Sequence, residues 1–263
     1  MLTVTSISKT FFPDTVNERT ALDRLSLSMA EGDFVTVIGS NGAGKSTLLN
    51  AISGKLAVSR GSIEIDGVRV NRLPDYKRAK YIGRVFQDPL AGTAPHLTIE
   101  ENLSLALLRG RRRGLGPGLN KKRRQLFAEE LAMLELGLED RLTAKVGLLS
   151  GGQRQALSLL MAGFTQPRIM LLDEHTAALD PQRAELVTTI TERIVREGGL
   201  TTLMVTHNME QAIRLGNRLI MMHEGRIVYE ADAATKSKLT VQDLLREFTK
   251  IKGATLSDQA FLG

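Results

Sequence analysis

The residues from Gly39 to Thr47 have the types and spacing needed to bind a phosphate group. Gly39, four further residues and then Gly44-Lys45-Ser46 form the P-loop pattern, in which glycines let backbone N–H groups turn inward around an anion. Lys45 is expected to reach the β- and γ-phosphates of a nucleotide, and the Ser46 hydroxyl to ligate Mg²⁺. The residues expected to line this site are Ser40, Asn41, Gly42, Ala43, Gly44, Lys45, Ser46 and Thr47.

A strand and a helix are predicted on either side of this loop. Residues 34–38 are apolar and mostly β-branched, which favours a buried strand, and residues 46–52 have a helical pattern. Strand, glycine-rich loop and helix are the context that distinguishes a phosphate-binding loop from a chance glycine-rich turn. The positive end of the helix adds to the attraction for the anion.

Two adjacent carboxylates, Asp173 and Glu174, follow an apolar stretch at 169–172 that predicts a buried strand. Ligands bind at the carboxyl ends of parallel strands, so both side chains are expected to face the nucleotide. Asp173 would hold Mg²⁺, usually through water, and Glu174 would orient and polarise the attacking water. Two solvated acids at a strand end would be the simpler interpretation, and the P-loop argues against it.

A second anion site is predicted at Leu149-Ser150-Gly151-Gly152-Gln153. Ser150 can cap the helix that follows, while Gly151 and Gly152 expose backbone N–H groups at its positive end. An ordinary serine-capped helix does not explain two consecutive glycines, because alanine favours a helix more. Two phosphate sites in one polypeptide suggest that two copies share each nucleotide.

With these motifs in this order, the chain resembles the ATP-binding cassette family over nearly all of residues 1–235. Leu149 to Gln153 matches the family signature, and Gln87 matches the Q-loop glutamine, which the resemblance implies senses Mg²⁺ and water. Asp180 matches the D-loop, and His207 matches the switch histidine that contacts the γ-phosphate. The resemblance thus implies catalytic roles for Glu174, His207, Lys45 and Gln87, metal contacts for Ser46, Gln87 and Asp173, and nucleotide contacts for Ser150, Gly151, Gly152, Gln153 and Asp180.

Two further positions depend on this resemblance. Phe11 lies where the family places an aromatic residue that stacks on adenine, and Phe12 competes for that role. His175 stands where the family usually has proline. His175 is expected to act as a neutral spacer, the alternative being a contact with the other subunit.

Composition limits the possible classes of protein. The chain has 263 residues and no cysteine, which excludes disulfides, cysteine-ligated metal and a cysteine nucleophile. It has neither an apolar run of membrane-spanning length nor a signal-peptide pattern, so a soluble, cytoplasmic chain is expected. The net charge of +6 is concentrated at 109–113 and 121–124, either as solvated faces or as a surface near lipid headgroups or acidic partner loops.

The expected fold class is α/β: a P-loop NTPase (RecA-like) core, an N-terminal antiparallel β subdomain and an inserted α-helical subdomain at about 88–165. These parts form an ATPase domain over 1–235, followed by a short C-terminal helix and tail over 236–263. Within the insertion, Thr98 and Glu101 predict a capping box. An amphipathic helix is predicted over 121–136, with an apolar face formed by Leu126, Phe127, Leu131, Leu134 and Leu136.

The resemblance implies the ATPase subunit of a membrane transporter, with ATP and Mg²⁺ as cofactors and a head-to-tail dimer as the working form. Its expected partners are integral membrane permease subunits, a second copy of itself and an extracytoplasmic solute-binding protein. The chain would lie on the inner face of the membrane through the permease. Import of a small solute such as an amino acid is expected, the alternative being export, since some exporters also have a separate cassette.

Two other classes of protein were weighed against the transporter subunit. A soluble cassette ATPase acting on DNA or ribosomes usually has two cassettes or a long coiled coil, whereas this chain has one cassette and a compact insertion. Its basic stretches also lack interleaved aromatic residues, so no specific nucleic-acid binding is expected. A simple P-loop kinase or GTPase would lack the signature and the ordered Gln87, Asp180 and His207.

Overall fold

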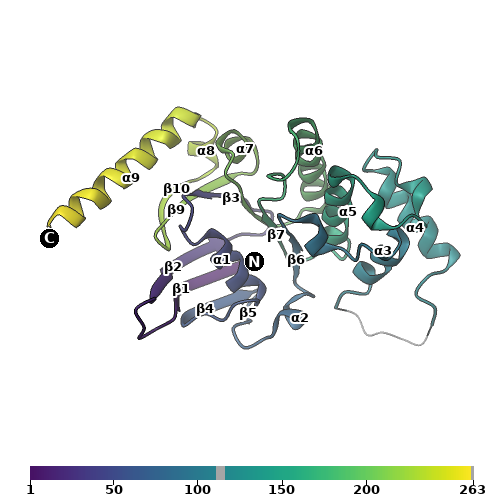
Figure 1. The fold of residues 1–263 in the computed structure, drawn as a ribbon, viewed down its shortest axis with the longest axis horizontal. Coiled ribbons are helices and arrows are strands. Elements are labelled where there is room, and N and C mark those ends of the chain that lie inside the picture. Colours follow the sequence, from purple (N-terminus) through teal and green to yellow (C-terminus); the bar gives the residue numbers. More distant parts are fainter. Residues whose placement is uncertain (111–115, 262–263) are drawn as a thin grey trace. The chain divides into compact units, whose positions relative to one another are not determined.

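The computed structural model describes residues 1–110 and 116–261, and these form two compact units (Figure 1). The first unit consists of residues 1–72 and 203–263, and the second of residues 73–202. The predicted phosphate loop lies in the first unit, and the two predicted carboxylates and the signature stretch lie in the second.

The first unit begins with a four-stranded antiparallel sheet in the order β2-β1-β4-β5. Its strands are β1 (Leu2–Phe11), β2 (Arg19–Met29), β4 (Arg60–Ile65) and β5 (Val68–Arg69). Along the end of β2, leucine or methionine at 25, 27 and 29 is buried, whereas serine at 26 and 28 is exposed. This alternation confirms the half-buried strand that the sequence predicts.

The strands β10, β9, β3 and β8, adjacent in that order, carry the predicted phosphate loop. Their bounds are β3 (Phe34–Gly39), β8 (Thr202–Val205), β9 (Arg218–His223) and β10 (Arg226–Ala231), and β8 begins at the last residue of the second unit. β3 pairs in parallel with β9, which pairs antiparallel with β10. Every residue of β3 is buried, as its apolar sequence predicts.

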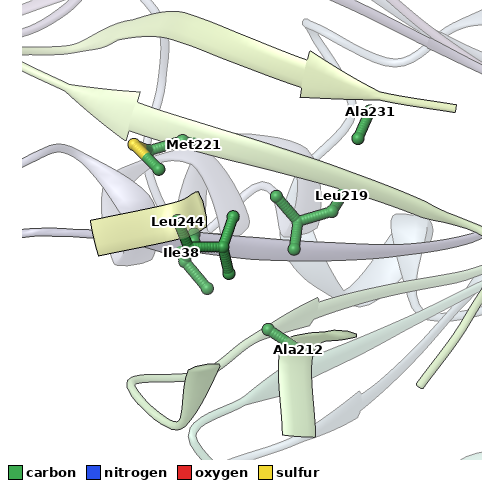
Figure 2. Close-up of a cluster of buried hydrophobic side chains, with 6 residues drawn as sticks. All are labelled: Ile38, Ala212, Leu219, Met221, Ala231 and Leu244. Carbon is green, nitrogen blue, oxygen red and sulfur yellow. The ribbon is translucent and has the colours of Figure 1, made fainter. Parts of the chain in front are cut away.

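The remaining elements of the first unit are helices: α1 (Lys45–Ser53), α7 (Met209–Arg214), α8 (Ala233–Lys236) and α9 (Val241–Phe261). Ala212 of α7 and Leu244 of α9 pack with side chains of the strands in one buried cluster, whose other members are Ile38, Leu219, Met221 and Ala231 (Figure 2). α9 extends through most of the segment for which a short helix and a tail were expected.

The second unit contains two parallel strands, β6 (Ile82–Val85) and β7 (Ile169–Asp173). The stretch between them in the sequence contains α3 (Ile99–Leu107), α4 (Lys121–Ala132) and α5 (Gly151–Gly163), where a helical insertion was predicted. The same stretch contains three short 3₁₀ turns: η1 (Pro89–Gly92) precedes α3, and η2 (Glu139–Arg141) and η3 (Val146–Leu148) lie between α4 and α5. α2 (Asp75–Arg78) precedes β6, and α6 (Pro181–Gly198) follows β7.

The capping box predicted at the start of α3 is confirmed. The backbone N–H of Glu101 donates to Thr98 Oγ1 at 3.2 Å, and the Thr98 N–H donates to Glu101 Oε2 at 2.7 Å. These two bonds satisfy backbone donors that the first helical turn leaves without a partner.

The prediction for α4 was too long and partly wrong about its apolar face. The helix ends at Ala132 instead of 136, because Glu135 and Gly137 adopt left-handed backbone conformations that a right-handed helix cannot contain. Phe127 and Leu131 are fully buried, but Leu126 is 37% exposed. Phe127 packs edge to face against Phe164 of the same unit, with ring centroids 5.8 Å apart.

Over the residues that the structure describes, no helix is both long enough and apolar enough to span a bilayer.

Candidate functional site

The loop between β3 and α1 has the backbone geometry of an anion cradle. Gly42 and Gly44 have φ angles of 81° and 99°, in the left-handed region that glycine adopts without strain. A Cβ atom on Gly44 would lie 2.4 Å from the Ala21 carbonyl oxygen, so this position accepts only glycine. Gly44 is also the N-cap of α1, and no side chain caps the first turn of that helix. A phosphate group fits a helix N-terminus of this kind, which follows a glycine-rich loop and has no side-chain cap.

Lys45 places a positive charge inside this loop. Its side chain is 5% exposed, and Nζ donates hydrogen bonds to the Gly39 carbonyl at 2.7 Å and the Ser40 carbonyl at 3.0 Å. Both acceptors are neutral carbonyl groups, which satisfy donors of the ammonium group. Ser46 is exposed and Thr47 is half-buried. The charge and the backbone donors of this loop therefore fit the polyphosphate of a nucleotide.

The end of β1 favours Phe11 over Phe12 as the aromatic residue beside the loop. Phe11 is paired with Arg19 of β2, and Arg19 Nη2 donates to the Gly42 carbonyl at 3.4 Å. The strand register thus connects Phe11 to the phosphate loop through one side chain. Phe12 lies beyond the strand, is 66% exposed and has a left-handed backbone. The stacking of Phe11 on adenine stays a prediction.

His207 lies just after β8 and close to the same loop in the sheet. The N–H of Thr206 donates to the Val37 carbonyl of β3 at 3.1 Å, two residues before the loop begins at Gly39. Asn208 caps α7 by accepting from the Gln211 N–H at 2.9 Å. The exposed His207 is thus fixed between two hydrogen-bonded neighbours. The first unit therefore brings together the P-loop, Phe11 and His207.

In the second unit, Asp173 makes an ion pair that the sequence analysis missed. Arg84 Nη2 lies 3.0 Å from Asp173 Oδ2, and the two side chains are 12% and 15% exposed. Arg84 pairs with Leu171 in the parallel register of β6 and β7, which puts Asp173, two residues further on, on the same face of the sheet. The guanidinium also lies 4.7 Å from the centre of the Phe86 ring, next to the exposed Gln87.

The carboxylate of Asp173 fits a metal ion that arrives with phosphate groups. Within residues 1–110 and 116–261, no cluster of three or more His, Asp or Glu side chains could form a complete metal site. Mg²⁺ commonly takes one or two carboxylates from the protein and completes its shell with water and substrate phosphates. A single carboxylate at a strand end agrees with that mode of binding.

Glu174 has an unusual backbone conformation, with φ at 48°. Its carbonyl accepts a hydrogen bond from the Ala177 N–H at 3.0 Å, which closes a tight turn directly after β7. The side chain is half-buried. Left-handed non-glycine residues concentrate at functional sites, where the surrounding structure holds them in place.

His175 contacts its own chain instead of a second subunit. It is 2% exposed, and its Nε2 lies 3.0 Å from Thr191 Oγ1 in α6. Burial lowers the pKa of His175 to about 4, so the ring is neutral at physiological pH. The expectation of a neutral residue is confirmed, but the spacer is also a hydrogen-bonding group.

The start of α5 is capped as predicted. Ser150 Oγ accepts from the Gln153 N–H at 3.3 Å, and Gln153 Oε1 accepts from the Ser150 N–H at 3.1 Å, which completes a capping box. The sequence analysis missed this role of Gln153, although the spacing Ser-x-x-Gln indicates it.

Gly151 and Gly152 are not required by the packing of their own chain. A Cβ atom on Gly151 would meet Leu179 at 3.4 Å, and one on Gly152 would meet the Arg183 side chain at 3.4 Å. Both separations are ordinary van der Waals contacts, and neither glycine has a left-handed backbone. Because alanine would fit and would favour the helix, the reason for two glycines lies outside the chain's own packing.

Asp180 has a local structural role that the sequence analysis did not assign. It caps α6 by accepting from the Arg183 N–H at 3.1 Å, and Pro181 follows as the first helical residue. Its carboxylate also pairs with Arg183 Nε at 3.2 Å on the surface. The predicted contact of Asp180 with nucleotide stays a prediction.

Several basic side chains from the two arginine- and lysine-rich stretches make contacts within the chain. Arg109 donates to the carbonyls of Met161 and Ala162, at 2.6 and 3.3 Å, near the end of α5. Arg124 pairs with Glu100 through two hydrogen bonds of 2.6 and 3.1 Å. Residues 111–115, which include three more arginines, lie outside the described residues. The Glu100 carboxylate offsets the charge of Arg124, whereas the two carbonyls engage the Arg109 side chain without changing its charge.

Residues 22–177 match the family model described as ABC transporter. A tyrosine transport ATP-binding protein of Clostridioides difficile (strain R20291) is 47% identical over 249 residues, which are 94% of this chain and 98% of that protein. The spermidine/putrescine import ATP-binding protein PotA of Bacteroides fragilis (strain YCH46) is 33% identical over 86% of this chain and 46% of its own length.

Solved structures of cassettes have the same fold. The dimeric ATP-binding cassette MJ0796, in a post-hydrolysis state bound to ADP and Pi, matches with a TM-score of 0.76 at 32% identity, over 89% of this chain and 99% of that one. The ADP conformation of MJ1267, an ATP-binding cassette of an ABC transporter, also matches with a TM-score of 0.76, at 25% identity, over 95% and 98% of the two chains. The predicted P-loop NTPase fold is thereby confirmed.

Acid is expected to destabilise the wild-type protein more than a His175→Gln variant. The pKa of His175 is about 4 in the folded chain and 6.5 ordinarily, so between these values the unfolded chain binds a proton that the folded chain does not. This contribution to the free energy of unfolding is constant above about pH 6.5 and falls as the pH drops towards 4, by on the order of 2 kcal/mol at pH 5. Urea unfolding of both proteins at pH 7.5 and 5 measures it. The same loss in both would contradict a buried neutral imidazole.

Proposed function

Because the chain belongs to the ABC transporter family and is an ATP-binding, ATP-hydrolysing subunit, we propose that two copies of it enclose ATP and drive import of a small solute. The proposed ATPase domain covers residues 1–235, with the helical insertion at about 88–165. The proposed partners are a second copy of the chain, integral membrane permease subunits and an extracytoplasmic solute-binding protein. The permease would hold the chain at the inner face of the membrane.

In this proposal the P-loop holds the phosphates of ATP. Lys45 exchanges its carbonyl partners, Gly39 and Ser40, for the β- and γ-phosphate oxygens, which neutralise its charge. The first turn of α1, which no side chain caps, supplies backbone donors to the same phosphates. Phe11 stacks on the adenine ring.

The hydrolytic groups are proposed to act on the γ-phosphate. Glu174 orients the attacking water and accepts its proton, His207 contacts the γ-phosphate, and Gln87 senses the occupied site. Ser46, Gln87 and Asp173 are the residues proposed to hold Mg²⁺. When bound, Mg²⁺ supplies positive charge that stabilises the phosphate oxygens during hydrolysis. To bind Mg²⁺, Asp173 would give up part of its ion pair with Arg84.

The proposal that two copies form a dimer is supported mainly by the two glycines at the start of α5. Neither Gly151 nor Gly152 is needed for the conformation or the packing of this chain, because neither has a left-handed backbone and an added Cβ atom would make only ordinary contacts. An anion from another molecule that approaches the helix N-terminus closely would require them, since a side chain there would hold it away. The γ-phosphate of ATP on a second P-loop is such an anion, and a head-to-tail pair of chains would deliver it. The solved relative MJ0796 is itself a dimer.

Gly152→Ala tests the proposed dimer because it should impair assembly of the two copies without destabilising the fold of each copy. The variant should be as stable as wild type or more so, by roughly 1 kcal/mol at most, since alanine fits and favours the helix. It should bind ATP as one copy but lose at least about tenfold in turnover, because the added methyl group blocks the second phosphate contact. Urea unfolding, nucleotide titration and steady-state ATPase assays measure these three quantities.

Gly116→Ala is the matched control, since a Cβ there meets nothing within 4 Å. Size-exclusion chromatography with ATP and Mg²⁺ in a Glu174→Gln background should show a dimer for the control and a monomer for Gly152→Ala. If Gly152→Ala dimerises and hydrolyses ATP at the control rate, the shared-nucleotide arrangement is refuted.

Import of an amino acid is proposed from the relatives. One relative, which matches nearly the whole chain, is a tyrosine transport ATP-binding protein, and another is a spermidine/putrescine import ATP-binding protein. We favour tyrosine because that match is more similar and covers both chains almost completely. The surface proposed to receive the permease runs from Gln87 to Pro95 and on to about Leu108, and Leu90 in η1 exposes 44% of its surface there.

Uptake by cells tests the proposed cargo. Deleting the gene in its host should abolish high-affinity uptake of labelled tyrosine, and wild-type protein should restore it while Glu174→Gln should not. Spermidine uptake should be unchanged in all three strains. Normal tyrosine uptake in the deletion strain would reject tyrosine as the cargo, and loss of spermidine uptake instead would assign the polyamine.

A nucleic-acid role has little support in the described structure. Arg109 and Arg124 are engaged by carbonyl and carboxylate groups of their own unit, so they are poor candidates for phosphate contacts along DNA or RNA.

A further inference from the structure

The left-handed backbone of Glu174 depends on the residues on both sides of it. A left-handed conformation costs a non-glycine residue about 1 kcal/mol or more, and it persists only where its surroundings enforce it. On one side, the four residues of β7 before Asp173 are fully buried and fix the chain up to Leu172. Hydrogen bonds from the Ala177 N–H to the Glu174 carbonyl, at 3.0 Å, and from the Leu179 N–H to the Thr176 carbonyl, at 3.2 Å, close the turn.

His175 provides a restraint on the other side. It is the residue directly after Glu174, so the two Cα atoms are about 3.8 Å apart and the position of one limits the other. Its ring is 2% exposed and bonded to Thr191, which lies in the middle of α6. An anchored imidazole on the adjacent residue therefore ties the Glu174 turn to a long helix.

The hydrogen bond has a defined direction. Thr191 Oγ1 donates its single proton to the Val187 carbonyl at 2.7 Å, so toward His175 it can only accept. His175 must then carry its proton on Nε2. This fixes both the tautomer and the orientation of the ring, because a flipped ring would turn a C–H group toward the Thr191 oxygen.

We propose that His175 is a positioning residue for hydrolysis: its hydrogen bond to Thr191 holds Glu174 in the left-handed conformation that aims the carboxylate at the attacking water. The inference rests on the proposed role of Glu174 as the base. A histidine that only fills the core would contribute to stability without selectively affecting the rate of the chemical step. The two possibilities therefore differ in what they predict for kcat, KM and the coupling to Glu174.

Three variants test the hydrogen bond. His175→Leu and Thr191→Val each remove it, and both should lower kcat about 10- to 100-fold while KM and the affinity for ATP change less than threefold, because a misplaced base slows chemistry and leaves binding intact. His175→Gln keeps an N–H at similar reach and should recover most of the rate. Thr188→Val is the matched control, since the Thr188 hydroxyl is also buried in α6 and donates to the carbonyl four residues back, that of Ala184.

All rates are measured where circular dichroism shows every variant fully folded. An unchanged kcat in His175→Leu, or an equal loss of kcat in Thr188→Val, would overturn the positioning role.

Coupling to Glu174 gives the decisive comparison. In a Glu174→Gln background, His175→Leu should cause no further loss of the residual rate, because the group that it positions is gone. If His175→Leu lowers that residual rate by the same factor as in wild type, it does not act through Glu174 and the inference fails. If Glu174→Gln alone hydrolyses ATP at the wild-type rate, the proposed base is wrong instead, so the two failures are distinguishable.

Discussion

The positive charge of Lys45 inside a loop of backbone carbonyl and N–H groups is the interaction on which this site depends. An ammonium group that is almost completely removed from water is costly unless hydrogen-bonded, and the Gly39 and Ser40 carbonyls accept two of its hydrogen bonds. The adjacent helix begins at a glycine that cannot cap it. Both features favour the arrival of a polyphosphate, which satisfies the helix donors and the charge together. β3 and the glycines at 42 and 44 serve to hold this arrangement.

Helix N-termini elsewhere in the chain show how selective this feature is. α3 and α5 both begin with a complete capping box, and α6 begins with Asp180 as its cap. α1 begins at Gly44, which has no side chain that could cap the first turn. α5 is a mixed case, because a capping box satisfies part of its first turn, and the two glycines that follow Ser150 are not required by the packing of the chain. In the proposed dimer, the phosphates of ATP therefore bind at the N-terminus of α1 in one copy and contact the N-terminus of α5 in the other.

Residue types and short spacings predicted the local parts of the site. The P-loop, the strand before it, the cap at Ser150 and the capping box at Thr98 each depend on neighbours within a few residues, and the structure has all four elements. Contacts between distant residues could not be predicted in this way. Arg84 meets Asp173 across 89 residues only because two parallel strands adopt one register, and His175 meets Thr191 only because the turn after β7 contacts α6. The choice between Phe11 and Phe12 likewise depended on where β1 ends and on the left-handed backbone of Phe12.

Isothermal titration with ATP is the most direct test of the central claim that the Lys45 charge is held in place for a phosphate group. Wild-type protein is compared with Lys45→Ala and with Lys55→Ala, which removes an exposed lysine shortly after α1. Charge-assisted hydrogen bonds contribute about 1.5–3 kcal/mol each, so Lys45→Ala should weaken ATP binding by roughly 10- to 100-fold or more. Lys55→Ala should bind ATP as the wild-type protein does. Wild-type affinity in a folded Lys45→Ala variant would contradict the account.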